Sequence, residues 1–350
     1  MITGNYTLVI LTPGFPGHEA DTTCLPAQQT FIKALNHAFP SIRIIILSFQ
    51  YPSGSSAYRW FGNEVISFGI NGGFYRKLQW MHIWERLRQI KKENNILGLL
   101  SFWCTECALI GKYFGWFYGI KHYCWVCGQD ARKENKLVRL IRPKPRELVA
   151  MSDSLAKEFY KNHGIRPHCI IPNGIDITQF KEPSNGRDID ILGAGSLIAL
   201  KQYQVFLDIV SALSFHFPGL KAMICGKGPE EPRLQAQIAA LHIHSIVSLA
   251  GERAHPEIIR LMQRTRIFLH PSSYEGFSTA CIEALYAGAQ VISFCSPMTQ
   301  NPGHWHIVNN KEEMLQKAAE LLKDPQLDHE RVMAYSMEDS ARSMMELFEH

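Results

Sequence analysis

The chain has 350 residues, 46% of them hydrophobic and 19% charged, with a formal net charge of +4. This composition is typical of a globular protein and excludes disordered and fibrous classes. No apolar stretch reaches the roughly 18 residues that a membrane span needs. The first residues lack the basic region and cleavage site of a signal peptide, so we expect a cytoplasmic protein. This length suits two domains, each with its own core.

The charge is divided unevenly along the chain. Residues 1–175 hold 21 Lys and Arg against 11 Asp and Glu, a net charge of +10, whereas residues 176–350 hold 15 against 21, a net charge of −6. Such a split suggests two domains that face different partners. Many basic residues lie in 75–92, interleaved with apolar ones at helical spacing, and in 132–146. The first segment fits either a basic amphipathic helix at the inner face of a membrane or a surface helix that packs on its own sheet.

The nine cysteines are too few for a disulfide scaffold, and their odd number fits a reducing compartment. Cys104 and Cys107, followed by Cys124 and Cys127, match the spacing of a four-cysteine zinc site. The second pair, however, lies in what looks like a buried strand, where positions three apart point to opposite faces. We therefore expect buried structural thiols and no metal.

Apolar strand-like runs alternate with helical periodicity, which is typical of parallel α/β architecture. In the first half the predicted strands are 6–11, 42–49, 96–102, 122–126, 147–150 and 168–171, and the predicted helices include 26–38, 74–93 and 154–163. A passage with linker composition covers 172–186. The second half has predicted strands at 189–193, 222–225, 246–249, 267–270 and 290–294, and a helical segment from about 312 to 348 that is broken near Pro325.

The simplest arrangement is an α/β protein with two Rossmann-like domains, 1–175 and 176–330, whose parallel sheets face each other across a cleft. Residues 331–350 would form a C-terminal helix that could cross back to the N-terminal domain. In such sheets ligands bind at the carboxyl ends of the strands, so we expect the functional site there.

The most informative segment is 270–288. It predicts the end of a strand at His270, a turn, and a helix that begins near Ser278 or Thr279. Gly276 lets the backbone approach a ligand closely, and the free N–H groups at the helix start suit a phosphate. Glu275 and Glu283 flank that position. Because carboxylates only accept hydrogen bonds, they suit the hydroxyl groups of sugars on either side of the phosphate.

This segment resembles the Glu, seven residues, Glu signature of family 4 retaining glycosyltransferases (group 1), which have the GT-B fold. The resemblance implies that Glu275 binds donor sugar hydroxyls, that Glu283 binds the ribose, and that Gly276, Phe277, Ser278 and Thr279 bind the phosphate and sugar through the backbone. The stretch 171–176 is similar to the family's interdomain motif, and those around Gly226 and Gly251 to strand ends that border the donor. Together these segments cover about residues 170–295.

The stretch 195–201 resembles the family's loop that carries a phosphate-binding Arg and Lys. Lys201 is the best candidate for catalysis, because a cation stabilises the charge that develops on a departing nucleoside diphosphate, and Glu275 is the second catalytic candidate. Ser196 stands where the family usually has Arg. A second cation would have to come from elsewhere, for which Lys227 and Arg253 are candidates.

The resemblance is thinner over the first half. Gly17, or Gly14, occupies the place of the family's glycine-rich loop near the diphosphate. Cys127 stands where many relatives have a His, so Gln129 or Asp130 could contact sugar or acceptor instead, although Asp130 could equally cap the next helix. Asp188 and Asp190 fit the Asp-x-Asp pattern of metal-dependent transferases but enter a strand in the wrong domain, and we interpret them as structural.

These features predict a metal-independent retaining hexosyltransferase that uses a nucleotide-diphosphate sugar, without any other cofactor, and transfers the sugar to a glycan, lipid-linked or other hydroxyl acceptor. The basic first half would suit an anionic or membrane-held acceptor and a peripheral membrane location. We expect no nucleic acid partner. Two alternatives remain: a non-catalytic sugar-nucleotide-binding protein, motivated by Ser196 and Cys127, and a sugar-nucleotide epimerase of the same fold.

Overall fold

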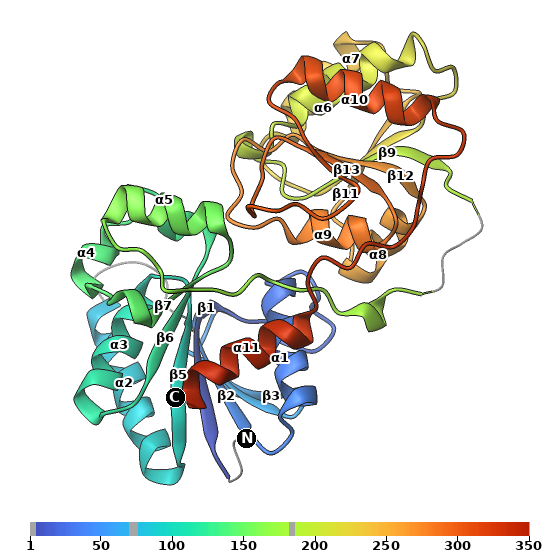
Figure 1. Ribbon diagram of the computed structural model, residues 1–350. Helices are drawn as coiled ribbons and strands as arrows, with labels where there is room; N and C mark the ends of the chain where they lie inside the picture. Colours follow the sequence, from blue (N-terminus) through green and yellow to red (C-terminus); the bar gives the residue numbers. More distant parts are fainter. Residues whose placement is uncertain (1–4, 70–75, 182–185, 350) are drawn as a thin grey trace. The chain divides into compact units, whose positions relative to one another are not determined.

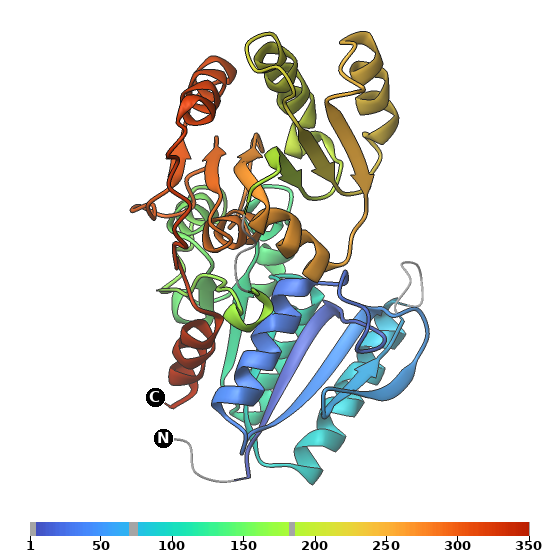
Figure 2. The ribbon, with the colours of Figure 1, turned by 90° about the vertical axis from the view of Figure 1, so that its right-hand side faces the viewer.

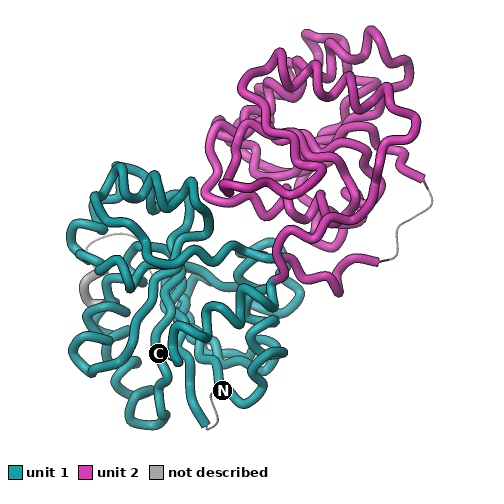
Figure 3. The backbone as a smooth tube through the Cα atoms, in the orientation of Figure 1, with its two compact units in different colours: residues 1–174, 337–350 teal, residues 175–336 magenta. Residues whose placement is uncertain are grey.

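The computed structural model describes residues 5–69, 76–181 and 186–349. The chain divides into two compact units, which Figure 3 shows in different colours. Unit 1 comprises Met1–Gly174 and Met337–His350, and unit 2 comprises Ile175–Ser336. The start of the predicted helix 74–93 and part of the predicted linker 172–186 lie outside the described residues. The expected cleft between the domains stays a prediction, and each unit is described by itself.

Unit 1 is built on an eight-stranded sheet in the order β3-β4-β2-β1-β5-β6-β7-β8. All neighbouring strands are parallel except β3 and β4, which form an antiparallel pair. The strands are β1 (Thr7–Gly14), β2 (Arg43–Tyr51), β3 (Ser56–Trp60), β4 (Asn63–Ser67), β5 (Ile96–Phe102), β6 (His122–Val126), β7 (Leu148–Ala150) and β8 (Cys169–Ile170). The helices are α1 (Pro26–Ala38), α2 (Arg76–Glu93), α3 (Glu106–Tyr118), α4 (Leu137–Ile141), α5 (Asp153–His163) and α11 (Met337–Glu349).

Helix α2 settles one question that the sequence left open. Its Ile83 and Leu87 are fully buried in a core that also contains residues of β1, β2 and α3, and Trp80 and Trp84 pack against that core. The ring of Trp84 lies 5.0 Å from the ring of Phe114 in α3. The apolar stripe of this basic helix therefore packs on its own sheet and is not a free membrane-binding face.

The last helix, α11, packs within unit 1 beside α1, as Figure 1 and Figure 2 both show. The hydroxyl of Tyr123 in β6 donates to the carbonyl oxygen of Leu347 at 2.7 Å, and its ring meets that of Phe348 edge to face. The Phe348 ring occupies the space beside Gly98, where a Cβ atom would lie 2.2 Å from it. Glycine in the middle of β5 is therefore required for this helix to dock.

Unit 2 has a six-stranded parallel sheet in the order β11-β10-β9-β12-β13-β14. Its strands are β9 (Ile189–Ala194), β10 (Ala222–Cys225), β11 (Val247–Gly251), β12 (Thr265–His270), β13 (Gln290–Ser293) and β14 (Trp305–Ile307). Helices α6 (Tyr203–Ser214), α7 (Glu231–Ala240) and α10 (Lys311–Lys323) cover one face of the sheet, and α8 (His255–Gln263) and α9 (Thr279–Tyr286) cover the other (Figure 1).

The strand order of unit 2 reverses at one place. From β9 the chain moves outward through β10 to β11, then returns to β12 on the other side of β9 and continues outward to β14. The helices that follow β9 and β12, α6 and α9, lie on opposite faces of the sheet (Figure 1), and in such sheets ligands bind beside the carboxyl ends of the two strands. The topology makes the ends of β9 and β12 the place to look for a ligand site.

The elements differ from the sequence predictions at a few points. The hairpin of β3 and β4, helix α3 and strand β14 were not predicted. The break predicted near Pro325 in the helical segment 312–348 is confirmed, since α10 ends at Lys323 and α11 begins at Met337 in the other unit. No helix among the described residues is long and apolar enough to cross a bilayer.

Candidate functional site

Three glycine-containing loops at the carboxyl ends of β9, β10 and β11 hold one another through their backbones. Gly195 N–H donates to the Cys225 carbonyl at 2.9 Å, and Gly226 N–H donates to the Gly251 carbonyl at 2.8 Å. A Cβ atom on Gly226 would lie 1.9 Å from the carbonyl oxygen of Gly195, and Gly226 also has a φ of +150°. Only glycine fits there. The loops therefore form a compact edge in which all three glycines are partly buried.

Lys201 is the last residue of the 3-10 turn Ala199–Lys201, just before α6. The carbonyl oxygen of the preceding Leu200 accepts the backbone N–H of Ser273 at 3.0 Å and the hydroxyl of Ser272 at 3.3 Å. These bonds join the loop after β9 to the loop after β12. The lysine is thereby placed beside the start of the Glu275–Glu283 segment.

The central feature of the site is a buried ionic cluster. The Lys201 Nζ atom lies 2.5 Å from Glu275 Oε1, and His270 Nε2 lies 2.8 Å from the same oxygen. The side chains of Lys201, Glu275 and His270 are 18%, 13% and 3% exposed. Both contacts use Oε1, and among residues 186–349 no hydrogen bond to Oε2 occurs. That oxygen is available to accept a hydrogen bond from a ligand hydroxyl.

The protonation states follow from this geometry. Burial alone would raise the pKa of Glu275, but the hydrogen bond from His270 and the charge of Lys201 outweigh it and lower the pKa to about 2. Burial lowers the pKa of His270, so its imidazole is neutral at pH 7 and donates its Nε2–H to the carboxylate. The cluster therefore presents one ammonium, one carboxylate and one neutral imidazole.

Helix α9 begins at Thr279, with Ser278 at its N-cap. Gly276, Phe277 and Ser278 are buried, and the ring of Phe277 packs edge to face on that of Tyr335. The first N–H groups of a helix have no partner within it and carry partial positive charge. The predicted phosphate seat thus lies at the start of α9, in the same turn that carries Glu275.

Glu283, one turn into α9, has a partner on the neighbouring helix. His255 Nε2, at the start of α8, lies 2.7 Å from Glu283 Oε1, and the two side chains are 17% and 11% exposed. The histidine fixes the carboxylate through one oxygen. Both carboxylates of the sequence motif are therefore held by a histidine that comes from outside the motif's own helix.

The comparisons with known proteins concern the same part of the chain. The family model described as glycosyl transferases group 1 matches residues 174–336, nearly the same range as unit 2. Residues 174–336 are thus similar in sequence to group 1 glycosyl transferases. This match includes every residue of the ionic cluster and both motif carboxylates.

Two curated relatives show how far the likeness in sequence extends. A phosphatidylinositol N-acetylglucosaminyltransferase subunit of Homo sapiens is 27% identical over 163 residues, 45% of this chain and 34% of that protein. 2-Deoxystreptamine N-acetyl-D-glucosaminyltransferase of Niallia circulans is 27% identical over 135 residues, 39% of this chain and 32% of that protein. The matches thus span about a third of these relatives' length.

A solved structure extends the likeness to both units at the level of fold. Anabaena HepE, in complex with UDP and glucose, superimposes with a TM-score of 0.71 at 16% identity and covers 98% of this chain and 99% of its own. With two parallel-sheet α/β units and such neighbours, the chain has the GT-B fold.

Ser196, where the sequence resemblance implies an Arg, is exposed in the loop after β9. Of the two candidate substitutes for a second cation, Arg253 pairs with Glu257 at 3.3 Å and donates to the Ala250 carbonyl, whereas Lys227 is exposed. Lys227 lies in the loop after β10, and its carbonyl oxygen accepts the N–H of Leu197 at 3.0 Å. Within the described part of the chain, Lys227 is thus the candidate whose ammonium has no ion-pair partner, and its backbone lies beside the Ser196 loop.

The remaining predicted residues lie in unit 1. Gly17 follows β1 and lies near Pro52, and Gln129 is exposed in the turn after β6. Asp130 is 1% exposed and accepts the backbone N–H of Cys127 at 2.8 Å, so it caps its own turn. Burial raises the pKa of Asp130 to about 7. Of the three acceptor-side candidates, only Gln129 offers its side chain to solvent.

The four cysteines of the zinc-like spacing are free and buried. Burial raises the pKa of Cys107, Cys124 and Cys127 well above the ordinary value, which keeps these thiols protonated. Among the described residues no three His, Cys, Asp or Glu side chains converge in a way that could hold a metal ion. Asp188 pairs with Arg264, and Asp190 accepts the N–H of Lys221 at 2.9 Å.

Sequence reasoning missed His270 and His255. His270 could have been found from its place at the carboxyl end of the strand next to β9, five residues before Glu275. His255 carries no such signal, because its contact with Glu283 depends on how α8 packs beside α9.

Proposed function

We propose that the protein is a retaining glycosyltransferase that moves a sugar from a nucleotide-diphosphate sugar to a hydroxyl acceptor. The observation that carries this proposal is the Lys201–Glu275–His270 cluster at the point where the strand order of unit 2 reverses. It combines a cation for the diphosphate with a carboxylate that can accept hydrogen bonds from a sugar, in a domain of the group 1 family.

Each group has a role in this scheme. On donor binding the diphosphate sits at the start of α9 and shares the Lys201 ammonium with Glu275. The free Oε2 of Glu275 accepts a hydrogen bond from a sugar hydroxyl, and Glu283, oriented by His255, accepts one from the ribose. His270 holds Glu275 in place, so it is a positioning residue.

The reaction we propose is a same-face substitution without a covalent enzyme intermediate. The bond between the anomeric carbon and the β-phosphate oxygen breaks, and the acceptor oxygen bonds to the same face of that carbon. The proton of the acceptor hydroxyl passes to the departing phosphate oxygen. Lys201 stabilises the negative charge that develops there, so the scheme needs no metal ion. Removing one such stabilising group from a transition state costs about 10²–10³-fold in kcat.

Donor and acceptor classes are proposed from the relatives. Both curated relatives are named as N-acetylglucosaminyltransferases, and HepE was solved with UDP, so a UDP-sugar such as UDP-N-acetylglucosamine is the first donor to try. For the acceptor we propose a glycan or lipid-linked hydroxyl held at the inner face of a membrane. The excess of positive charge over residues 1–175 supports this choice.

A calorimetric comparison of uridine, UDP and UDP-N-acetylglucosamine tests the proposal, because each ligand adds one part of the donor. We expect Lys201→Met to lose most of the gain from uridine to UDP. We expect Glu275→Gln to lose most of the gain from UDP to the UDP-sugar. Lys323→Met, which removes an exposed lysine at the end of α10, serves as the matched control for charge. Wild-type protein that binds UDP no more tightly than uridine would refute the assignment of the diphosphate seat.

A further inference from the structure

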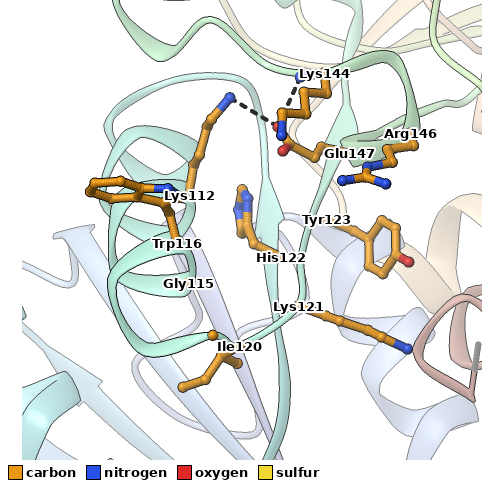
Figure 4. A pocket seen from close by; sticks show the side chains of 11 residues that line it. Lys112, Gly115, Trp116, Ile120, Lys121, His122, Tyr123, Lys144, Arg146 and Glu147 are labelled. Atoms are coloured by element: carbon orange, nitrogen blue, oxygen red, sulfur yellow. Dashed lines mark hydrogen bonds and ion pairs between the residues drawn. The ribbon is translucent and has the colours of Figure 1, made fainter.

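Unit 1 contains a pocket of about 550 Å³ that includes none of the site residues predicted from the sequence (Figure 4). It is formed by the C-terminal end of α3, the start of β6 and the turn before β7. These are the amino ends of the strands. The sequence-predicted residues of unit 1 follow β1 and β6 at their carboxyl ends, on the opposite edge of the sheet.

A buried hydrogen-bond acceptor lies at the pocket. His122 is 9% exposed, and its Nε2 lies 2.9 Å from the Ser101 hydroxyl. That hydroxyl donates its proton to the Cys107 carbonyl at 3.0 Å, so it accepts from His122 Nε2–H. The other ring nitrogen, Nδ1, then carries a lone pair, and it has no hydrogen-bond partner within the described part of the chain.

The protein keeps this imidazole neutral. Burial and the charge of Lys112 lower the pKa of His122 to about 3. Helix α3 can approach the ring only because it carries glycines, since a Cβ atom on Gly111 would lie 2.7 Å from the imidazole. A buried acceptor without a donor costs free energy unless a ligand or water supplies one, so Nδ1 favours a ligand that carries a hydroxyl group.

The mouth of the pocket is positively charged. Four cationic side chains line it against one carboxylate, Glu147, which pairs with Lys112 at 3.0 Å. Lys144 and Arg146 are exposed and have no ion-pair partner among the described residues. In Figure 4 both side chains lie at the side of the pocket next to Glu147. Two unpaired cations, one of them a guanidinium that can bind two oxygens at once, suit a phosphate group.

The third element is an exposed aromatic ring. Trp116 of α3 lines the pocket and is 79% exposed. A rigid apolar face beside polar groups suits the carbon-bound hydrogens of a sugar or other cyclic polyol. One ligand class therefore fits the acceptor nitrogen, the unpaired cations and the indole together, namely a ring that carries both hydroxyl and phosphate groups.

We infer that this pocket binds a phosphorylated polyol, with a hydroxyl on His122 Nδ1, the phosphate on Lys144 and Arg146, and the ring over Trp116. Two sources share this chemistry, a soluble sugar phosphate and the headgroup of a phosphoinositide lipid. The inference does not rest on the proposed transferase activity, because every residue involved belongs to unit 1.

Calorimetry on the full chain tests the inference with glucose 6-phosphate, glucose and inorganic phosphate. We expect glucose 6-phosphate to bind more tightly than either fragment. The double variant Lys144→Ala/Arg146→Ala should lose about tenfold or more in affinity, since charge-assisted hydrogen bonds are lost. Lys157→Ala/Lys161→Ala removes two exposed lysines from α5 as the matched control, and Lys201→Met should leave this binding unchanged.

Two further arms locate the contact and its source. In 15N spectra of the histidine rings, glucose 6-phosphate should shift His122 Nδ1, and inorganic phosphate should not. Vesicles with phosphatidylinositol 4-phosphate are compared with vesicles of equal charge that contain phosphatidylserine. If the wild-type protein prefers the phosphoinositide vesicles and the double variant does not, the ligand is a lipid headgroup. If the protein binds glucose 6-phosphate but does not prefer those vesicles, the ligand is a soluble sugar phosphate. Binding no tighter than that of phosphate, or binding undiminished in the double variant, would overturn the inference.

Discussion

Replacing Lys201 with Met tests the ionic cluster without any substrate. The pKa of Glu275 falls from its ordinary value of 4.5 to about 2 in the folded protein. A group whose pKa is lower in the folded state stabilises that state above its unfolded pKa and loses this contribution as the pH falls toward the folded value. Here the contribution is about 3 kcal/mol at pH 7 and about 1 kcal/mol at pH 3.

We expect Lys201→Met to remove part of this contribution, because the hydrogen bond from His270 to the carboxylate remains. The free energy of unfolding of unit 2 should drop by about 1–2 kcal/mol at pH 7 and by less at pH 3. The assay is urea unfolding at both pH values, followed by hydrogen exchange of peptides from β9 and β12. These peptides report on unit 2 alone.

A control variant and a double variant test whether the effect comes from the Lys201–Glu275 pair. Lys227→Met removes an exposed lysine from the next loop and should change stability by less than about 0.5 kcal/mol. The double variant Lys201→Met/Glu275→Gln should be less destabilised than the sum of its single variants, by about 1–3 kcal/mol. A penalty for Lys201→Met that is the same at pH 3 and pH 7, or strict additivity with Glu275→Gln, would contradict the proposed pairing.

Three more predictions follow from contacts elsewhere in the chain. In steady-state kinetics, His255→Phe should raise the KM for the donor about tenfold with a smaller change in kcat. The substitution removes the hydrogen bond that holds Glu283 but leaves Lys201 in place. Gly226→Ala should lower the stability of unit 2 by about 3 kcal/mol in urea unfolding, because its Cβ would lie 1.9 Å from the Gly195 carbonyl oxygen. Gly98→Ala should speed hydrogen exchange in 337–349 by displacing Phe348, whereas Gly119→Asn, in open space at a helix end, should not.

Much of the fold could be predicted because parallel strands buried on both faces produce unbroken apolar runs, as in β5, β6 and β10. The hairpin of β3 and β4 was missed because its exposed residues, such as Ser56 and Ala57, give no apolar run. Strand β14 was missed because it has only three residues.

The site was predictable in part for a similar reason. Glu275 and Glu283 lie in one local motif, so the sequence shows their spacing directly. The histidines that hold them contact them through tertiary packing, which no spacing reveals. The same is true of the pocket at His122, whose hydrogen-bond partner Ser101 is on a neighbouring strand.

The central claim is that Lys201 supports departure of the diphosphate while the sugar keeps its anomeric configuration. The most direct test is to follow transfer from UDP-N-acetylglucosamine by proton NMR in wild-type protein and in Lys201→Met. We predict a product with the donor's α configuration, formed about 10²–10³-fold more slowly by the variant. A β product, or a variant that transfers at the wild-type rate, would contradict the account.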